Sequence, residues 1–355
     1  MIVDDRAARK LLAVITRQAY GGTLRSKPRG VATMPEVHEA CGLDPDELYP
    51  LLKKLVDARL VSVSGEYPFE ELTLIGVPAE HRLSINGAEL VIWEWPGDDP
   101  PVFFCHGTGL HSRCWDQVIV PLAGRRCYAL DLRGHGRSSR TPPFFWRTFG
   151  QDAAAVAQAL SLRGALGVGH SMGGNSVTQA AALHPEAFSA LLLIDPVIRP
   201  ESAYVGPFKG AAFVARRRNQ WSSPEEMFAS FQDRAPFATW DRQVLRDYCE
   251  YGLLPSANGY ELACPPAIEA QIYENGALPE SNIYPEIAAV RVPVHIVRAR
   301  PVTGPSDVMR GSPTAPDLAS HFASGTDLQL LDHSHFIPME APALTAKLIN
   351  DLIPG

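Results

Sequence analysis

The sequence predicts an α/β fold built on a mostly parallel β-sheet with helices on both faces. From Arg82 onward, short apolar runs alternate with helical patterns, and this alternation is typical of such sheets. Residues 101–105 form a continuous apolar run of the kind found in strands that are buried on both faces. Because the chain has 355 residues, of which 46% are hydrophobic and 20% charged, we expect one large domain and a smaller one.

The other strands of this sheet are expected where further short apolar runs occur. These runs lie at residues 90–95, 127–130, 165–168, 190–194, 292–297 and 328–331. Helical patterns lie between them at residues 152–160 and 176–183, and a closing helix is expected at about residues 343–352. Strands that alternate with helices in this way predict parallel pairing with crossover helices.

Residues 197–286 interrupt this alternation. They hold 13 of the 30 aromatic residues, and their patterns are helical rather than strand-like. We therefore expect an inserted helical lid at residues 197–286. The core of the large domain is then expected at residues 81–196 and 287–355, which leaves residues 1–80 as a separate N-terminal module.

The N-terminal module is expected to contain three helices followed by a β-hairpin. The patterns for these elements lie at residues 6–19, at about 34–41, from 44 onward, and at 60–63 and 71–75. The start of the third helix is the clearest, because Asp44 and Glu47 form a capping box with Pro45 at the first helical position. This order of elements resembles a winged helix-turn-helix module.

Charge argues against nucleic acid as the partner of this module. The chain has a net charge of −7, and residues 1–76 carry 10 Lys and Arg against 11 Asp and Glu. In a helix-turn-helix module the third helix enters the major groove, but here that helix begins with Asp44, Asp46 and Glu47, which would repel phosphate. DNA binding stays an open alternative, beside packing against the lid, homodimerisation or binding of another partner.

Cysteine spacing and hydropathy exclude several other classes of protein. The six cysteines form no C-x-x-C pair and no Cys/His metal spacing, so neither a disulfide scaffold nor a zinc site is expected. The chain starts with charged residues, and no apolar run approaches the roughly 18 residues that a membrane span needs. We expect a cytoplasmic protein with no membrane association, no metal and no organic cofactor.

The first chemical motif is a nucleophile elbow, Gly-x-Ser-x-Gly, centred on Ser171. It follows the strand pattern that ends at Val168 and precedes the helical pattern that begins near Gly174, which is the context that the motif requires. Glycine is expected at positions 169 and 173 because the chain must turn too sharply for larger side chains. The turn raises the serine oxygen above the edge of the sheet, next to the amides that open the following helix.

A second loop precedes this motif in the chain. Residues 105–109 follow a central strand and contain two glycines, and ligands bind at the carboxyl ends of strands in open α/β sheets. The backbone N–H groups of Thr108 and Met172 are therefore expected to form an oxyanion hole. His106, in the same loop, is interpreted as structural.

Residues 82–355 resemble the α/β-hydrolase family. The resemblance rests on the motifs HGTG, LDLRGHGRS and GHSMGG, and on a histidine near the end of the chain, in order and at the usual spacings. It implies the α/β-hydrolase fold. Because the nucleophile position holds Ser171 rather than aspartate, it also argues against the mechanisms of dehalogenases and epoxide hydrolases.

The resemblance implies a catalytic triad in the chain order serine, acid, histidine. The base is then expected after the last strand, where His333 and His335 both lie. His335 fits the terminal pattern of the family, a histidine with glutamate five residues later and then proline, and it is assigned as the general base. His333 is interpreted as structural.

The triad acid has two candidates. In the family it usually lies a few residues after the penultimate strand, whose counterpart is residues 292–298, but no carboxylate occurs at that distance. Asp307 is the next carboxylate and is assigned as the acid. Asp195, at the end of the strand pattern at residues 190–194, is the alternative, because some members of the family place the acid there.

These residues imply a serine hydrolase that acts on a carboxylic ester, a thioester or a similar small acyl substrate. Ser171 would form an acyl enzyme, His335 would be the general base, and aromatic lid residues would bind an apolar group. Two other enzyme types share the motifs, carbon–carbon bond hydrolases and cofactor-free haloperoxidases. A different class also stays open, a ligand-sensing regulator in which a hydrolase-like domain controls a DNA- or partner-binding head.

Overall fold

The computed structural model describes residues 7–8, 10–12, 14–15, 31–57, 61–64, 71–74, 78–122, 124–304, 307 and 310–353. The first helix expected at residues 6–19 lies partly outside the described residues, and those described within it are helical. The connection between the two hairpin strands lies outside them altogether.

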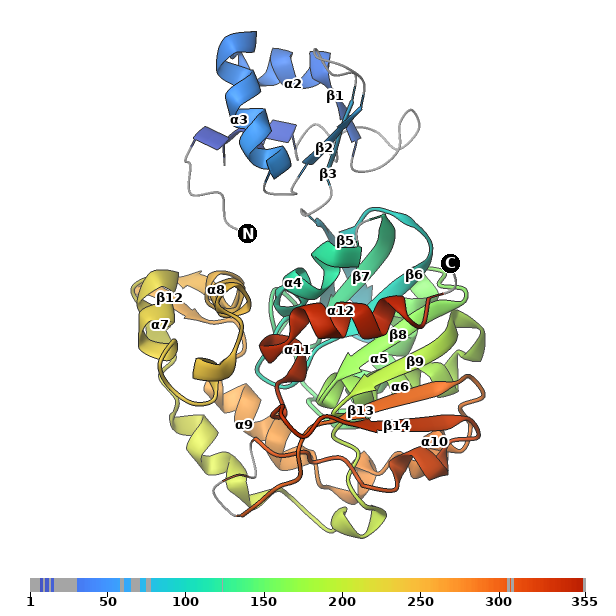
Figure 1. Ribbon diagram of the computed structural model, residues 1–355. Coiled ribbons are helices and arrows are strands. Elements are labelled where there is room, and N and C mark those ends of the chain that lie inside the picture. The colour runs from blue at the N-terminus through green and yellow to red at the C-terminus, as the bar shows by residue number, and fades with distance from the viewer. Residues whose placement is uncertain are drawn as a thin grey trace.

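An eight-stranded sheet forms the centre of the large domain (Figure 1). Its strand order is β14-β13-β9-β8-β6-β7-β5-β4. The strands are β4 (Ala79–Ile85), β5 (Ala88–Trp95), β6 (Asp98–Cys105), β7 (Arg125–Asp131), β8 (Ala165–His170), β9 (Phe188–Ile194), β13 (Val294–Arg298) and β14 (Gly325–Gln329). From β7 to β14 all neighbours are parallel, whereas β5 pairs antiparallel with β7 and with β4. The predicted mostly parallel sheet is confirmed.

Helices cover both faces of this sheet. They are α4 (Asp116–Ile119), α5 (Trp146–Ala159), α6 (Met172–Leu183), α10 (Tyr284–Ile287), α11 (Ile337–Glu340) and α12 (Pro342–Asn350). Helices α5, α6 and α10 pack on one face and α4 and α12 on the other. Within the described residues, no helix has both the length and the apolar character to cross a membrane.

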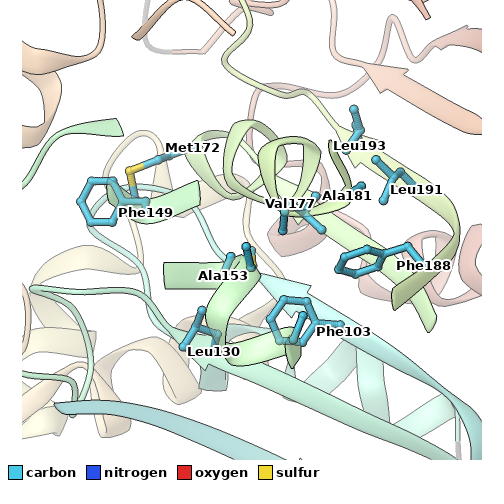
Figure 2. Close-up of a cluster of buried hydrophobic side chains, with 14 of the residues drawn as sticks. Phe103, Leu130, Phe149, Ala153, Met172, Val177, Ala181, Phe188, Leu191 and Leu193 are labelled. Carbon is cyan, nitrogen blue, oxygen red and sulfur yellow. The ribbon is translucent and has the colours of Figure 1, made fainter. Parts of the chain in front are cut away.

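Side-chain alternation along the strands creates two hydrophobic cores. Successive residues of a strand point to opposite faces, so Phe103 joins the cluster beneath α5 and α6, while Phe104 joins the cluster on the other face. Figure 2 shows part of the first cluster, in which Met172, the first residue of α6, lies beside Phe149 of α5. The first turn of α6 is therefore anchored in the core.

The segment inserted between β9 and α10 was expected to be helical. It contains a small sheet as well as helices. It contains α7 (Pro224–Phe231), α8 (Arg242–Tyr251) and α9 (Pro266–Asn275), but also a small antiparallel sheet of β10 (Gln220–Trp221), β12 (Gly259–Leu262) and β11 (Leu253–Ser256). A third hydrophobic cluster links this segment to the core through Leu110 and Met339. The insertion is thus packed against the loops at the carboxyl ends of the strands.

The N-terminal segment has a hydrophobic cluster of its own. Its described elements are β1 (Val31–Thr33), α2 (Met34–Cys41), α3 (Pro45–Asp57), β2 (Val61–Ser64) and β3 (Glu71–Leu74), and its strands form an antiparallel sheet in the order β1-β3-β2. The predicted capping box is present, since the Glu47 N–H donates to Asp44 Oδ1 at 3.0 Å and the Asp44 N–H donates to Glu47 Oε2 at 3.4 Å. The antiparallel pairing of β2 with β3 agrees with the expected hairpin.

Candidate active site

Ser171 occupies a strained turn between β8 and α6. Its φ of 57° and ψ of −122° are unfavourable for a residue with a side chain. A Cβ atom on Gly169 would lie 2.4 Å from the Gly173 carbonyl oxygen, and one on Gly173 would lie 2.1 Å from the Cys105 carbonyl oxygen. Both positions therefore require glycine, and the close packing of β6, β8 and α6 sustains the strain at Ser171.

His335 connects Ser171 to a buried carboxylate. Its Nε2 lies 3.0 Å from Ser171 Oγ, and its Nδ1 lies 2.6 Å from Asp195 Oδ2. The other oxygen of Asp195 accepts hydrogen bonds from the Ala299 N–H, at 2.9 Å, and from the Ser312 hydroxyl. Since Asp195 is fully buried, these donors hold its carboxylate in one orientation.

The assignment of Asp307 as the partner of His335 is corrected by this geometry. Both carboxylate oxygens of Asp307 are bound by the Arg300 guanidinium, at 2.6 and 2.7 Å, and the Thr303 N–H and hydroxyl also donate to it. The Arg300 hydrogen bond is the main reason why the pKa of Asp307 lies well below its usual range. Asp195, the alternative carboxylate, occupies the position beside His335.

Asp195 reaches His335 because β9 and β13 are parallel neighbours. Their carboxyl ends lie at the same edge of the sheet, so Asp195, directly after β9, meets Ala299, directly after β13. The loop after β14 then carries His335 to the same edge. The carboxylate is supplied by the strand adjacent to the one that the family pattern favours.

Local hydrogen bonds fix the loop that carries His335. Its N–H donates to the Arg310 carbonyl oxygen at 2.7 Å, and its own carbonyl oxygen lies 2.8 Å from His170 Nε2. Glu340 accepts from both the N–H and the hydroxyl of Ser334. This contact explains the glutamate five residues after the histidine, and His333 lies 3.5 Å from the same carboxylate. The role of His170 is not apparent from the sequence.

His106 and His135 stabilise the loop that follows β6. The Leu132 N–H donates to Nε2 of His106, so the proton of this neutral ring is on Nδ1, which donates to the Gly107 carbonyl oxygen at 2.8 Å. The Gly109 N–H donates to Nε2 of His135 at 3.0 Å. Burial lowers the pKa of both rings to about 3, which is consistent with the structural role expected for His106.

Thr108 lies beside the start of α6, where an oxyanion hole was expected. Its hydroxyl is 3.4 Å from the sulfur of Met172. A Cβ atom on Gly107 would lie 2.9 Å from Ser171 Cβ, so glycine is needed for the loop to approach the serine this closely. The loop and the first turn of α6 thus flank Ser171, and the amino end of a helix favours negative charge.

Two adjoining cavities lie at this edge of the sheet. The smaller, of about 170 Å³, is lined by Ser171, His335 and Arg199 among others. The larger, of about 460 Å³, is lined mainly by the inserted segment, including Phe213, Phe237, Trp240 and Tyr248. Both cavities share Thr108, Leu110, Tyr273 and Phe336 as wall residues. In the part of the chain that the structure describes, no group of three or more His, Cys, Asp or Glu residues is placed to hold a metal ion.

Comparison with known proteins identifies the family. Residues 102–348 match the family model of the Alpha/beta hydrolase family. The chain belongs to this family. Its curated relatives include the bifunctional esterase/perhydrolase DCH of Acinetobacter calcoaceticus, which is 33% identical over 157 residues (42% of this chain and 51% of the relative). The α/β-hydrolase fold predicted from the motifs is confirmed, with a mostly parallel sheet and many helices.

Other relatives cover more of this α/β hydrolase. The lipase LipV of Mycobacterium tuberculosis is 26% identical over 263 residues, which is 72% of this chain and 94% of the lipase. The crystal structure of E-2-(acetamidomethylene)succinate hydrolase superposes with a TM-score of 0.62 at 21% identity, over 77% of this chain and 98% of that protein, which supports the fold. The chain spans 51% of the length of DCH and 42% of the length of a non-heme chloroperoxidase of Streptomyces lividans.

Proposed function

We propose that this α/β hydrolase is a serine hydrolase that acts on a carboxylic ester or thioester through an acyl enzyme. The observation that carries the proposal is the continuous series of contacts from Ser171 Oγ through His335 to Asp195. Ser171 is the nucleophile, His335 is the general base, and Asp195 orients His335. Asp307, which is neutralised by Arg300, has no part in the reaction.

The first half of the reaction forms the acyl enzyme. His335 Nε2 takes the proton of Ser171 Oγ as this oxygen attacks the substrate carbonyl carbon. The carbonyl oxygen becomes an oxyanion, which the N–H groups of Thr108 and Met172 stabilise. The carbon–oxygen or carbon–sulfur bond of the substrate then breaks, and the His335 imidazolium returns the proton to the departing alcohol or thiol.

The second half releases the acyl group. His335 takes a proton from water, the hydroxide oxygen attacks the acyl carbon, and the bond to Ser171 breaks as His335 protonates Ser171 Oγ. Asp195 accepts the Nδ1–H hydrogen bond throughout, so Nε2 is free to accept a proton. Because its carboxylate is buried and held by Ala299 and Ser312, the negative charge faces the imidazolium with little reorganisation.

The inserted segment is proposed to act as a lid over these steps. It supplies the aromatic walls of the larger cavity and the ion pair between Arg217 and buried Glu269, both of which line it. A cavity of this size and character suits the apolar part of a small ligand. Enclosure by these side chains would also limit the access of water to the acyl enzyme.

The N-terminal segment is proposed to be a winged-helix-like accessory module. The order of its described elements and its antiparallel sheet β1-β3-β2 support this proposal. The first turn of α3 carries Asp46 and Glu47, which disfavours contacts of this helix with phosphate. Retention of the full chain on duplex DNA at low salt, lost as salt rises, would instead favour the regulator alternative.

Activity-based labelling tests the proposed function. A fluorophosphonate probe is expected to modify the folded protein at Ser171, as located by peptide mass spectrometry, and the Ser171→Ala variant is the control. Hydrolysis of a panel of p-nitrophenyl esters of increasing acyl length then measures how the larger cavity is used. A folded protein that is not labelled, or that is labelled equally in Ser171→Ala, would contradict the proposal.

A further inference from the structure

The guanidinium of Arg199, which lines the smaller cavity, has no carboxylate partner among the described residues. Arg199 lies in the same cavity wall as Ser171 and His335. Within the part of the chain that is described, its guanidinium makes one hydrogen bond, to the Gly276 carbonyl oxygen at 2.8 Å, and lies 5.7 Å from the ring centre of Phe208. No described Asp or Glu lies within 4.0 Å of it.

The backbone of Arg199 is held in place. Its N–H donates to the Tyr204 hydroxyl at 3.2 Å, and its carbonyl oxygen accepts from the Tyr284 hydroxyl at 3.0 Å. Gly276 follows the carboxyl end of α9, whose partial negative charge favours a nearby cation. Burial lowers the pKa of the guanidinium, which remains charged because arginine starts from such a high value.

The other arginines of the two cavities differ from Arg199. Arg217 is bound by the Glu269 carboxylate at 2.5 Å, and Arg310 lies 3.7 Å from Asp307. Both line only the larger cavity. A mostly buried cation that makes one neutral hydrogen bond is costly, and it lies where a substrate must bind. An anion that enters the smaller cavity would supply the missing partner.

We propose that the substrate carries a carboxylate that Arg199 binds beside Ser171. This inference rests on the proposed function and names its substrate class, an ester or thioester with a free carboxylate and an apolar group. The planar guanidinium can give a carboxylate two parallel hydrogen bonds. The carboxylate occupies the smaller cavity, and the apolar group extends past Tyr273 and Phe336 into the larger one.

Two esters with the same six-carbon acyl chain test this inference, monoethyl adipate, which has a free carboxylate, and neutral ethyl hexanoate. The ratio of their kcat/KM values, acid to neutral, is measured for the wild type and for R199Q, R199K and R310Q. The acidic ester is expected to be preferred, and R199Q is expected to lower the ratio about tenfold or more. R199K keeps the positive charge but loses the planar guanidinium, so its ratio should lie between those of the wild type and R199Q. R310Q, the matched control, should change the ratio by less than about twofold.

Binding to the Ser171→Ala variant provides a readout that does not need turnover. Calorimetry is expected to show monoethyl adipate binding at least tenfold more weakly when R199Q is added to Ser171→Ala. Equal binding of the two esters, no binding of the acidic ester, or no effect of R199Q would overturn the inference. If Ser171 is labelled by the fluorophosphonate but Arg199 has no effect, only the substrate class is wrong. If Ser171 is not labelled, the proposed function itself fails.

Discussion

Asp195 Oδ2 lies 2.6 Å from His335 Nδ1, although 140 residues separate the two in the chain. Because this contact fixes the tautomer of His335, the Asp195→Asn variant should offer an N–H where an acceptor is needed. We expect kcat for a p-nitrophenyl ester to fall by about 10⁴-fold. Asp307→Asn is the matched control, and its kcat should fall by less than about tenfold. A larger loss of kcat in Asp307→Asn than in Asp195→Asn would indicate that Asp307 is the triad acid.

The close packing around the turn at Ser171 predicts that a methyl group added at Gly173 destabilises the fold. A Cβ atom at position 173 would lie 2.1 Å from the Cys105 carbonyl oxygen, whereas one at Gly304 would meet nothing within 4 Å. Gly173→Ala is therefore expected to lower the free energy of unfolding by about 1–3 kcal/mol or more, and Gly304→Ala by less than about 0.5 kcal/mol. Urea denaturation measures both, and equal effects would contradict this packing.

Replacement of Arg199 and replacement of Arg133 are expected to affect the stability of the fold differently. Arg133 pairs with fully buried Asp152 at 2.8 Å. Arg133→Gln therefore leaves a buried carboxylate without its partner and should lower the free energy of unfolding by about 3–5 kcal/mol. Arg199→Gln leaves no carboxylate of the described residues without its partner, and the melting temperature should stay the same or rise. A large loss of stability in Arg199→Gln would indicate that Arg199 serves the fold rather than the substrate.

Three buried histidines make stability depend on pH. Burial is the main cause that lowers the pKa of His106, His135 and His170 to about 3, from about 6.5 in the unfolded chain. Between these values the unfolded state binds more protons than the folded state, so stability falls as pH falls. From pH 6.5 to pH 5 we expect the free energy of unfolding to decrease, by about 1.4 kcal/mol per pH unit for each histidine once it is fully protonated in the unfolded chain.

The His106→Gln variant measures the contribution of one of these histidines to the pH dependence of stability. The slope of unfolding free energy against pH, measured by urea denaturation, should become shallower by about one proton over that window. His321→Gln is the control, because His321 is exposed at the surface. An unchanged slope in His106→Gln would show that this ring is protonated in the folded protein.

Local sequence patterns were sufficient to predict most of the sheet. The buried strands β6, β8 and β9 contain continuous apolar runs, and such runs are visible without knowledge of their neighbours. Strand β4 was not predicted, because it lies at the edge of the sheet and four of its seven residues are charged or polar. Strands β10, β11 and β12 have only two to four residues each, too few to produce a clear pattern, so the insertion was expected to be entirely helical.

Some residues of the candidate site could likewise be predicted from local sequence patterns, and others could not. Ser171 has a local signature, since a strand, two glycines and a helix surround it. The proposed acid, Asp195, has none, because its position depends on the pairing of β9 with β13, which brings together residues about a hundred positions apart. One local signal was available, Arg300 seven residues before Asp307. An arginine this close can neutralise the carboxylate, and it does so here.

A rapid-mixing measurement of the acyl enzyme on Ser171 tests the proposed mechanism. With a p-nitrophenyl ester that is hydrolysed slowly, we predict a burst of p-nitrophenol equal to the enzyme concentration. Peptide mass spectrometry of the quenched sample should find the acyl group on Ser171, with no burst in Ser171→Ala and a much slower one in Asp195→Asn. Turnover of the ester by the wild type without an acyl group on Ser171 would contradict the proposed mechanism.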